Sequence, residues 1–300
     1  MFLFQRIEEV ALQYEDTKKD IAVFILREKE QLHTYSMQEI SDLTFTSKPA
    51  LVRFAKALGY RGWKDFMQAY VEEMVYQENH KALIDANVPF KSTSTFRQVV
   101  EGIREVHTQS SRDTADLLNI KQLMKAIDIL LFAKRIIVFG MRPNLFYGEI
   151  FKYNMSSIGV QVEVADIGEA GLIARSLTEK DCAIIISYSG NNVLREPLLH
   201  VPTLKQKKVS IIGITSGGEN FLKTNSDSFL CMSSRERLYS KIAPYATEES
   251  ILYILNVLYS LYFKSDYNYY LEYKIDNATT LERERFASLK EMKEEDGDIV

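Results

Sequence analysis

The strongest constraint on the fold is a change in hydrophobic pattern near residue 135. Before it, apolar residues recur at helical spacing, and the first eighty residues contain no convincing strand. After it, short apolar runs alternate with helical patterns, over residues 136–139, 160–164, 183–186, 209–214 and, more weakly, 228–231. Strands that are apolar throughout are covered on both faces. The pattern therefore predicts an α/β domain with a five-stranded parallel sheet and helices on both faces.

With 300 residues, the chain is long enough for two domains. Residues 81–95 look like a linker, since they contain Pro89 and a polar stretch, and helical periodicity resumes over 96–118 and from residue 120 to 132. We expect an all-α domain over 1–80, a linker and connecting helix over 81–118, the α/β domain over 119–266 and a C-terminal tail over 267–300. The tail is acidic over 294–298, and we expect it to be frayed.

The composition argues against several classes of protein. Arg6 interrupts any secretory signal, and the longest apolar run, over 251–263, is shorter than the ~18 residues of a membrane span. We interpret this run as a buried or dimer-facing helix. Cys182 and Cys231 both lie in apolar runs that look like strands, which indicates buried free thiols in a reducing compartment. We therefore expect a cytoplasmic protein with no metal site, no cofactor and no membrane partner.

Positive charge is concentrated on one short stretch of the N-terminal region. The chain has a net charge of −4, yet no acidic residue occurs between Asp42 and Asp65. The same interval contains five basic residues, which are Lys48, Arg53, Lys56, Arg61 and Lys64. Such a local basic surface is what a helix bound to DNA phosphates requires, and a merely solvated charged face is the simpler alternative.

Capping signals around this stretch favour DNA binding. Ser36 and Glu39 have the spacing of a capping box at the start of a short helix. After a turn, Thr46 or Ser47 caps a second helix, which carries Pro49 in its first turn and stops at residue 59. Two short helices at this spacing predict a helix-turn-helix motif with the basic residues on its second helix.

The second helix has a predicted inner face, formed by Leu51, Phe54, Ala55 and Leu58. The residues expected to contact DNA lie on the outer face or at the helix starts: Ser36, Gln38, Thr46, Ser47, Lys48, Ala50, Arg53 and Lys56. Residues near the start of such a helix reach base edges, so Ser47, Lys48 and Ala50 are the candidates for base readout. Arg53 and Lys56 are better placed to anchor phosphates.

A loop of small polar residues, from Ser187 to Asn192, follows the predicted strand over 183–186. We expect a helix directly after it. Backbone N–H groups at a helix start bind anions, Ser187 and Ser189 add hydroxyl donors, and Gly190 allows close approach. An ordinary turn is the alternative. Two more polar segments follow strands: the loop over 140–144 and Thr215. If the sheet is parallel, both lie at the same edge as the serine loop.

Residues 36–40, 46–48 and 51–60, with Gly62 and Trp63, closely resemble the N-terminal domain of RpiR-family bacterial regulators. That family typically has a Ser-Thr pair where this chain has Pro49 and Ala50, so one hydroxyl that could touch phosphate is absent. The helix itself tolerates proline in its first turn.

Residues 120–265 resemble a SIS domain, the sugar-isomerase module that forms the C-terminal half of such regulators, through residues 185–190, 211–215, 240–244 and 252–261. The resemblance implies a flavodoxin-like sheet and a bound phosphorylated sugar, with Ser187, Ser189 and Asn192 around the phosphate. The family's Gly-x-Gly-x-Ser loop is replaced by residues 140–144, where Arg142 supplies charge or fills the pocket. The predicted sugar-phosphate site comprises Arg142, Asn144, Ser187, Ser189, Gly190, Asn191, Asn192, Thr215 and Glu248.

Together these patterns predict a transcriptional regulator of carbohydrate-metabolism genes. It is expected to bind double-stranded operator DNA as a homodimer or homotetramer, with a phosphorylated sugar modulating that binding.

The alternative is a sugar-phosphate isomerase with an accessory helical domain. Isomerisation needs a general base, usually Glu or His, and none of His33, His80, His107 and His200 lies in a loop at a strand end. We expect His200 to be a partly exposed residue of the helix after the serine loop. Glu248 and Glu249 open a helix, where acidic residues have a simpler role. We therefore expect no catalytic residues and no enzyme activity.

Overall fold

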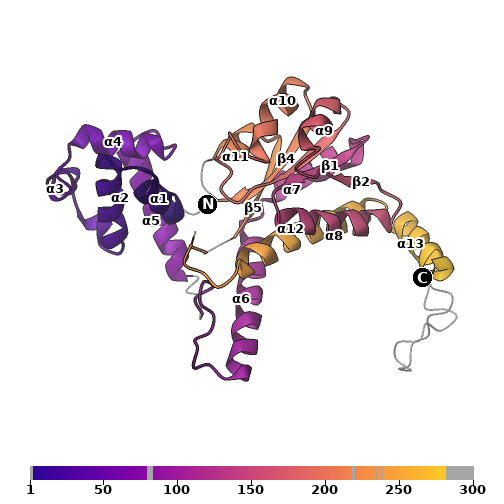
Figure 1. Cartoon of the computed structure of the whole chain (residues 1–300), viewed down its shortest axis with the longest axis horizontal. Helices are drawn as coiled ribbons and strands as arrows, with labels where there is room; N and C mark the ends of the chain where they lie inside the picture. Colours follow the sequence, from indigo (N-terminus) through magenta and orange to yellow (C-terminus); the bar gives the residue numbers. More distant parts are fainter. Residues whose placement is uncertain (1–2, 80–83, 218–219, 234–235, 238, 282–300) are drawn as a thin grey trace.

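The computed structural model describes residues 3–79, 84–217, 220–233, 236–237 and 239–281. The N-terminal part is helical, and residues 3–79 contain no strand. The remainder of the described chain forms an α/β domain beside it (Figure 1). The helices of the N-terminal part are α1 (Leu3–Gln13), α2 (Thr17–Arg27), α3 (Met37–Leu43), α4 (Lys48–Ala57) and α5 (Trp63–Asn79), with a short 3-10 turn, η1 (Leu32–Thr34).

The predicted caps define the helix-turn-helix motif formed by α3 and α4. Ser36 Oγ accepts the Glu39 backbone N–H at 3.2 Å, and a Glu39 carboxylate oxygen accepts the Ser36 N–H at 2.7 Å, so the capping box is confirmed. Ser47 Oγ caps α4 by accepting the Ala50 N–H at 3.4 Å. Gly59 has φ of +83° just after α4, a conformation that glycine adopts without strain.

Five parallel strands form the sheet of the C-terminal domain, in the order β2-β1-β3-β4-β5. They are β1 (Ile136–Gly140), β2 (Val162–Val164), β3 (Cys182–Ile186), β4 (Ser210–Ser216) and β5 (Ser228–Met232). Every neighbouring pair is parallel, as the continuously apolar runs predict. The order is that of a flavodoxin-like fold, which confirms the predicted fold class. The strand ends differ from the predicted ones by one or two residues; the largest differences are that β2 begins at Val162 and that β4 extends through Thr215 to Ser216.

Helices cover both faces of this sheet. Alternate strand residues, such as Val138 and Ile184, share a core with α7 (Ile120–Phe132), α8 (Asn144–Ser156) and α12 (Tyr245–Ser265). The intervening strand residues pack against the second set, α9 (Ala170–Ser176), α10 (Val201–Gln206) and α11 (Phe221–Asn225). Side chains alternate across a strand, so two separate apolar cores result.

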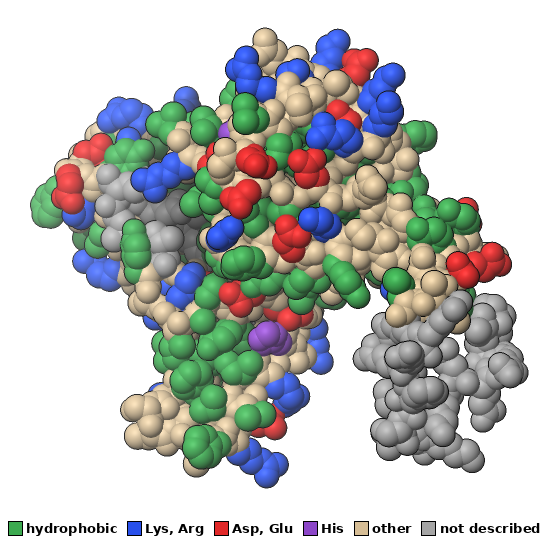
Figure 2. All heavy atoms as spheres, turned by 45° about the vertical axis from the view of Figure 1, so that its right-hand side comes forward, with side chains coloured by type: hydrophobic (Ala, Val, Ile, Leu, Met, Phe, Trp, Pro, Cys, Tyr) green, Lys and Arg blue, Asp and Glu red, His purple; other side chains and the backbone are tan. Residues whose placement is uncertain are grey.

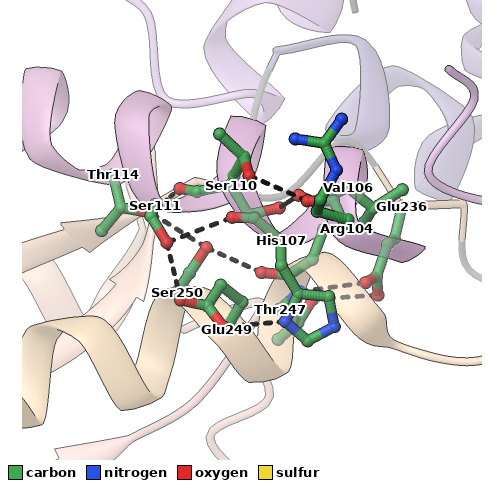
Figure 3. A network of polar contacts seen from close by, with 12 residues as sticks. Arg104, Val106, His107, Ser110, Ser111, Thr114, Glu236, Thr247, Glu249 and Ser250 are labelled. Atoms are coloured by element: carbon green, nitrogen blue, oxygen red, sulfur yellow. Dashed lines mark hydrogen bonds and ion pairs between the residues drawn. The ribbon is translucent and has the colours of Figure 1, made fainter. Parts of the chain in front are cut away.

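The connecting helix α6 (Phe96–Leu117) is fixed to α12 by a row of polar contacts (Figure 3). His107 Nδ1 lies 2.9 Å from one carboxylate oxygen of Glu249, and Ser111 Oγ donates to the other at 2.6 Å. Thr114 Oγ1 donates to Ser250 Oγ at 2.9 Å in the buried part of the row. These contacts attach the helix that follows the linker to the α/β domain.

Two expectations from the sequence are wrong. Residues 267–281 form a helix, α13 (Tyr267–Leu281), instead of a frayed tail; the acidic segment over 294–298 lies outside the described residues. The serine loop is not followed directly by a helix, because the chain runs through turns to the 3-10 turn η2 (Leu198–His200). Pro197 explains this, since proline disfavours helical backbone in the residue before it and has no N–H to donate.

None of the described helices combines the length and the hydropathy needed to cross a membrane. Within the same described part of the chain, no group of His, Cys, Asp and Glu side chains is arranged to hold a metal ion.

Candidate functional site

The basic residues of α4 form an exposed surface on the helical domain. Lys48, Arg53 and Lys56 are all exposed, and none of them forms an ion pair with a carboxylate in the described part of the chain. Arg61, by contrast, is paired with Asp65 at 3.0 Å. Lysine and arginine side chains are visible over the upper part of this domain in Figure 2. The three unpaired cations of α4 are thus available to a phosphate backbone.

The other predicted DNA contacts are more constrained. Ser36 is engaged in the capping box, and Gln38 Nε2 donates to Asp42 Oδ1 at 2.8 Å. Thr46 is half-buried, with its hydroxyl 2.8 Å from that of Thr44. To contact DNA, each of these side chains must either keep its intramolecular hydrogen bond or exchange it for one to DNA.

Ala50 does not lie on the outer face. It is only 5 % exposed and packs into the core of the helical domain, whereas the preceding N-cap, Ser47, is exposed. Ala50 precedes Phe54 by four residues and lies on the same side of the helix, so the inward face of α4 begins one residue earlier than expected. The predicted inward positions Leu51, Phe54, Ala55 and Leu58 are all buried, as expected.

A pocket of about 300 Å³ opens where β1 and β3 end. Four predicted residues line it, namely Asn144, Ser187, Ser189 and Asn192. β1 and β3 are paired with Gly140 opposite Ile186, so the loops that follow these residues emerge side by side. This is the carboxyl edge of a parallel sheet, where such folds bind ligands.

The two serines of the pocket present hydrogen-bond donors. Ser187 Oγ accepts the Gly190 backbone N–H at 3.3 Å, and Ser189 Oγ accepts the Asn191 N–H at 3.5 Å. Neither hydroxyl hydrogen has an acceptor among the described protein atoms. Each hydroxyl therefore keeps its donor hydrogen, and one lone pair, for a ligand.

Other predicted site residues support the loop without lining the pocket. Gly190 has φ of +63° and lies against Thr215 and Asn220, so a side chain there has no room. Thr215 is fully buried within β4 and donates to the Tyr188 carbonyl at 3.3 Å. Asn191 Oδ1 accepts the backbone N–H of Phe221 at 3.1 Å. These residues hold the serine loop in shape.

Arg142 and Glu248 are directed elsewhere. Arg142 is exposed and forms an ion pair with Asp166 at 3.2 Å, outside the residues that line the pocket. Glu248 hydrogen bonds to Tyr147, and burial together with this carboxylate raises the pKa of the tyrosine. Neither residue is among those that line the pocket, and their assignment to the ligand stays a prediction.

The pocket is also lined by residues outside the predicted site, among them Tyr188, Arg195 and Glu196. Glu196 is paired with His200 at 2.7 Å. His200 is buried, 8 % exposed, and packs against the Phe139 ring, so the expectation of a partly exposed helical histidine is wrong. Pro197 was the sequence signal that could have identified these residues. It replaces the expected helix by a turn, which brings residues 195 and 196 to the pocket.

The halves of the chain match two families of known domains. Residues 1–75 match the helix-turn-helix domain of the rpiR family, and residues 129–260 match the SIS domain. A relative from Haemophilus influenzae, named an uncharacterized HTH-type transcriptional regulator, is 23% identical to this chain over 82% of its length and 84% of the relative's.

Solved structures share the fold. The Vibrio vulnificus NanR protein, complexed with ManNAc-6P, aligns with a TM-score of 0.59 and 17% identity over 95% of this chain and 100% of its own. A putative sugar-phosphate isomerase from Listeria monocytogenes aligns with a TM-score of 0.52 and 15% identity over 63% of this chain and 99% of its own. With its matching N-terminal and C-terminal domains in this order, the chain belongs to the RpiR family of helix-turn-helix transcriptional regulators that carry a SIS domain.

Proposed function

We propose that this regulator binds operator DNA of carbohydrate-metabolism genes in the cytoplasm, and that a phosphorylated sugar bound at the carboxyl edge of the sheet modulates that binding. The observation that carries the effector proposal is the pair of pocket-lining serines, Ser187 and Ser189, whose hydroxyl hydrogens have no acceptor among the described protein atoms. The NanR protein, which shares this fold and was solved in complex with ManNAc-6P, supports the same class of effector.

DNA binding is assigned to α4. Lys48, Arg53 and Lys56 are exposed cations on one short helix, and Ser47 lies at its start. Phosphate contacts from such cations supply affinity, whereas residues near the helix start read base edges. We assign Arg53 and Lys56 to phosphates, and Ser47 and Lys48 to the groove.

A continuous set of contacts runs from the pocket to the linker. Tyr188, in the pocket wall, donates its hydroxyl hydrogen to the Glu236 carbonyl at 3.4 Å. The next residue, Arg237, donates its backbone N–H to Asn87 Oδ1 at 2.6 Å. Asn87 lies in the segment that joins the helical domain to α6. A ligand that shifts the serine loop therefore alters the hydrogen bonds that attach the linker to the α/β domain.

We propose a homodimer or homotetramer as the functional species. A dimer presents two copies of α4 to half-sites about 34 Å apart, one turn of B-DNA. A change in the linker then alters the spacing between the two recognition helices, and by linkage DNA changes the ligand affinity by the same factor.

The isomerase alternative gains one candidate base from the structure. Glu196 lines the pocket and is hydrogen bonded to His200, so a carboxylate is present beside the proposed ligand. We nevertheless assign the chain as a regulator without catalytic residues, because the carboxylate already has a partner and the chain carries a basic DNA-binding helix.

The proposal is tested with the full chain in two steps. First, the protein selects DNA from a library of random duplexes, and the duplexes that it retains define the operator. Second, the affinity of the protein for this operator is measured by fluorescence anisotropy, with and without each member of a panel of sugar phosphates that includes ManNAc-6P. We expect at least one compound to change operator affinity by about 5- to 150-fold, the usual range of allosteric coupling, without being consumed. Retention of no duplex, an unchanged affinity across the panel, or aldose–ketose turnover would contradict the proposal.

A further inference from the structure

We infer that Arg195 is the cation that binds the anionic group of the effector, and that it makes the pocket selective for phosphorylated over unphosphorylated sugars. This inference rests on the proposed function, since it concerns the same pocket. It assigns to Arg195 the role that the sequence suggested for Arg142.

The first argument is the charge balance of the pocket. Of the residues that line it, only Arg195 and Glu196 carry charge. The Glu196 carboxylate is hydrogen bonded to His200 at 2.7 Å, with both side chains largely buried. Arg195 has no ion-pair partner within the described residues. The Arg195 guanidinium is thus not bound to a carboxylate, and an anionic ligand can pair with it.

The second argument is the turn that replaces the expected helix. A loop of this kind normally stabilises an anion by the dipole of the helix that follows it, equivalent to roughly half an elementary charge. Here residues 193–197 form turns and a bend, so the helix expected directly after the serine loop, with its N-terminal dipole, is absent. The same turn, held by a bond from the Arg195 backbone N–H to the Asn192 carbonyl at 3.2 Å, places Arg195 in the pocket wall.

The third argument is the chemistry of the donors. The hydroxyls of Ser187 and Ser189 each have a hydrogen to donate to a ligand, and a guanidinium has five N–H donors and no acceptor. A phosphate monoester has several oxygens that accept such bonds, and arginine binds it bidentately. The amide groups of Asn144 and Asn192 remain for sugar hydroxyls. The ligand class that fits is a sugar phosphate with its phosphate between the serines and Arg195.

Arg142 provides a matched control. It is an exposed arginine in the loop after β1, but its guanidinium is paired with Asp166 outside the pocket. Replacing either arginine by alanine removes one positive charge from the same domain. Only the loss of Arg195 removes a donor from the pocket.

The test is isothermal titration of the full chain with inorganic phosphate, then with a panel of aldose and ketose phosphates and the same sugars unphosphorylated. We expect Arg195→Ala to weaken binding of phosphorylated compounds about 10- to 100-fold, as for the loss of a charge-assisted bond. Arg195→Lys should retain part of the affinity, since charge remains without the planar fork. Arg142→Ala should bind like the wild type. Circular dichroism confirms that each variant is folded.

The outcomes separate this inference from the proposed function. If Ser189→Ala abolishes binding while Arg195→Ala binds like the wild type, the pocket is correct and the role of Arg195 is refuted. Equal losses in Arg142→Ala and Arg195→Ala also refute it, because they indicate a general effect of net charge. If the wild-type chain binds no phosphorylated compound at all, the proposed effector class fails and this inference fails with it.

Discussion

The side-chain oxygen of Asn87 accepts a hydrogen bond from the backbone N–H of Arg237 at 2.6 Å, and the Asn87 carbonyl accepts one from Ile242 at 2.9 Å. Asn87 is buried, 4 % exposed, although it belongs to the segment between the two domains. The linker is therefore attached to a loop of the α/β domain that also contacts the pocket wall.

If this attachment transmits the effector signal, Asn87→Ala should uncouple the two sites. We expect ligand affinity and operator affinity to stay near their wild-type values, while the change in operator affinity caused by ligand decreases. Anisotropy titrations of a labelled operator with and without ligand measure this coupling. Lys91→Ala is the control, because Lys91 is an exposed residue of the same segment and its side chain forms no ion pair in the described part of the chain. A full response in Asn87→Ala would rule out this route.

Arg53→Ala should weaken operator binding and reduce its dependence on salt. Each phosphate contact releases counterions, so losing one lowers the slope of log K against log salt concentration by about 1. The loss should be similar for operator and random duplexes, since phosphate contacts carry no sequence information. Anisotropy titrations at several salt concentrations provide the slope. Arg104→Ala, on α6 and paired with Glu101 at 2.8 Å, should leave the slope unchanged.

Features set by local sequence could be predicted. The capping box at Ser36, the stop at Gly59 and the parallel pairing of the strands all follow from signals that act within a few residues or along a single strand, whereas the strand order was implied by the family resemblance. The parallel sheet then places the loops after β1 and β3 at one edge. That geometry alone predicts the contribution of Ser187 and Ser189 to the pocket.

Features set by tertiary partners could not be predicted. Arg142 is drawn to Asp166, a residue 24 positions away, and no local pattern indicates this pair. Arg195 reaches the pocket only because Pro197 converts a helix into a turn, and the direction of a side chain in an irregular turn depends on its surroundings. The helix α13 has no buried residue, so it lacks the apolar stripe by which helices are predicted.

Glu73 should make the helical domain less stable as the pH rises. Burial raises its pKa to about 6 from an ordinary value of 4.5, against the opposing effect of bonds from the backbone N–H groups of Leu3 and Phe4. A carboxyl group with a raised pKa in the native state binds its proton more tightly there than in the unfolded state. Its contribution to stability is therefore present below pH 4.5 and is lost as the pH rises through 6.

The measurement compares wild type with Glu73→Gln in urea, following the fluorescence of Trp63, the single tryptophan of the chain and part of the helical domain. We expect the stability of the wild type relative to the variant to fall by up to about 2 kcal/mol between pH 4.5 and pH 7. The exposed neighbour Glu72, changed to Gln, should show no comparable difference. A constant difference between wild type and Glu73→Gln across this range would contradict the prediction.

Gly190→Ala should destroy the pocket, because the position has neither the conformation nor the space for a side chain. Its φ is +63°, and a Cβ there would clash with Asn220 Oδ1 and lie 2.7 Å from Thr215 Oγ1. The left-handed backbone alone costs about 1–2 kcal/mol, so we expect the domain to lose at least about 2 kcal/mol and the effector response to disappear. Gly168→Ala is the matched control, since nothing lies within 4 Å of its Cβ. Thermal unfolding of the two variants, followed by circular dichroism with and without effector, provides the measurement. If Gly190→Ala kept both the wild-type stability and the increase in melting temperature caused by effector, the serine loop would tolerate rearrangement and would not define the site.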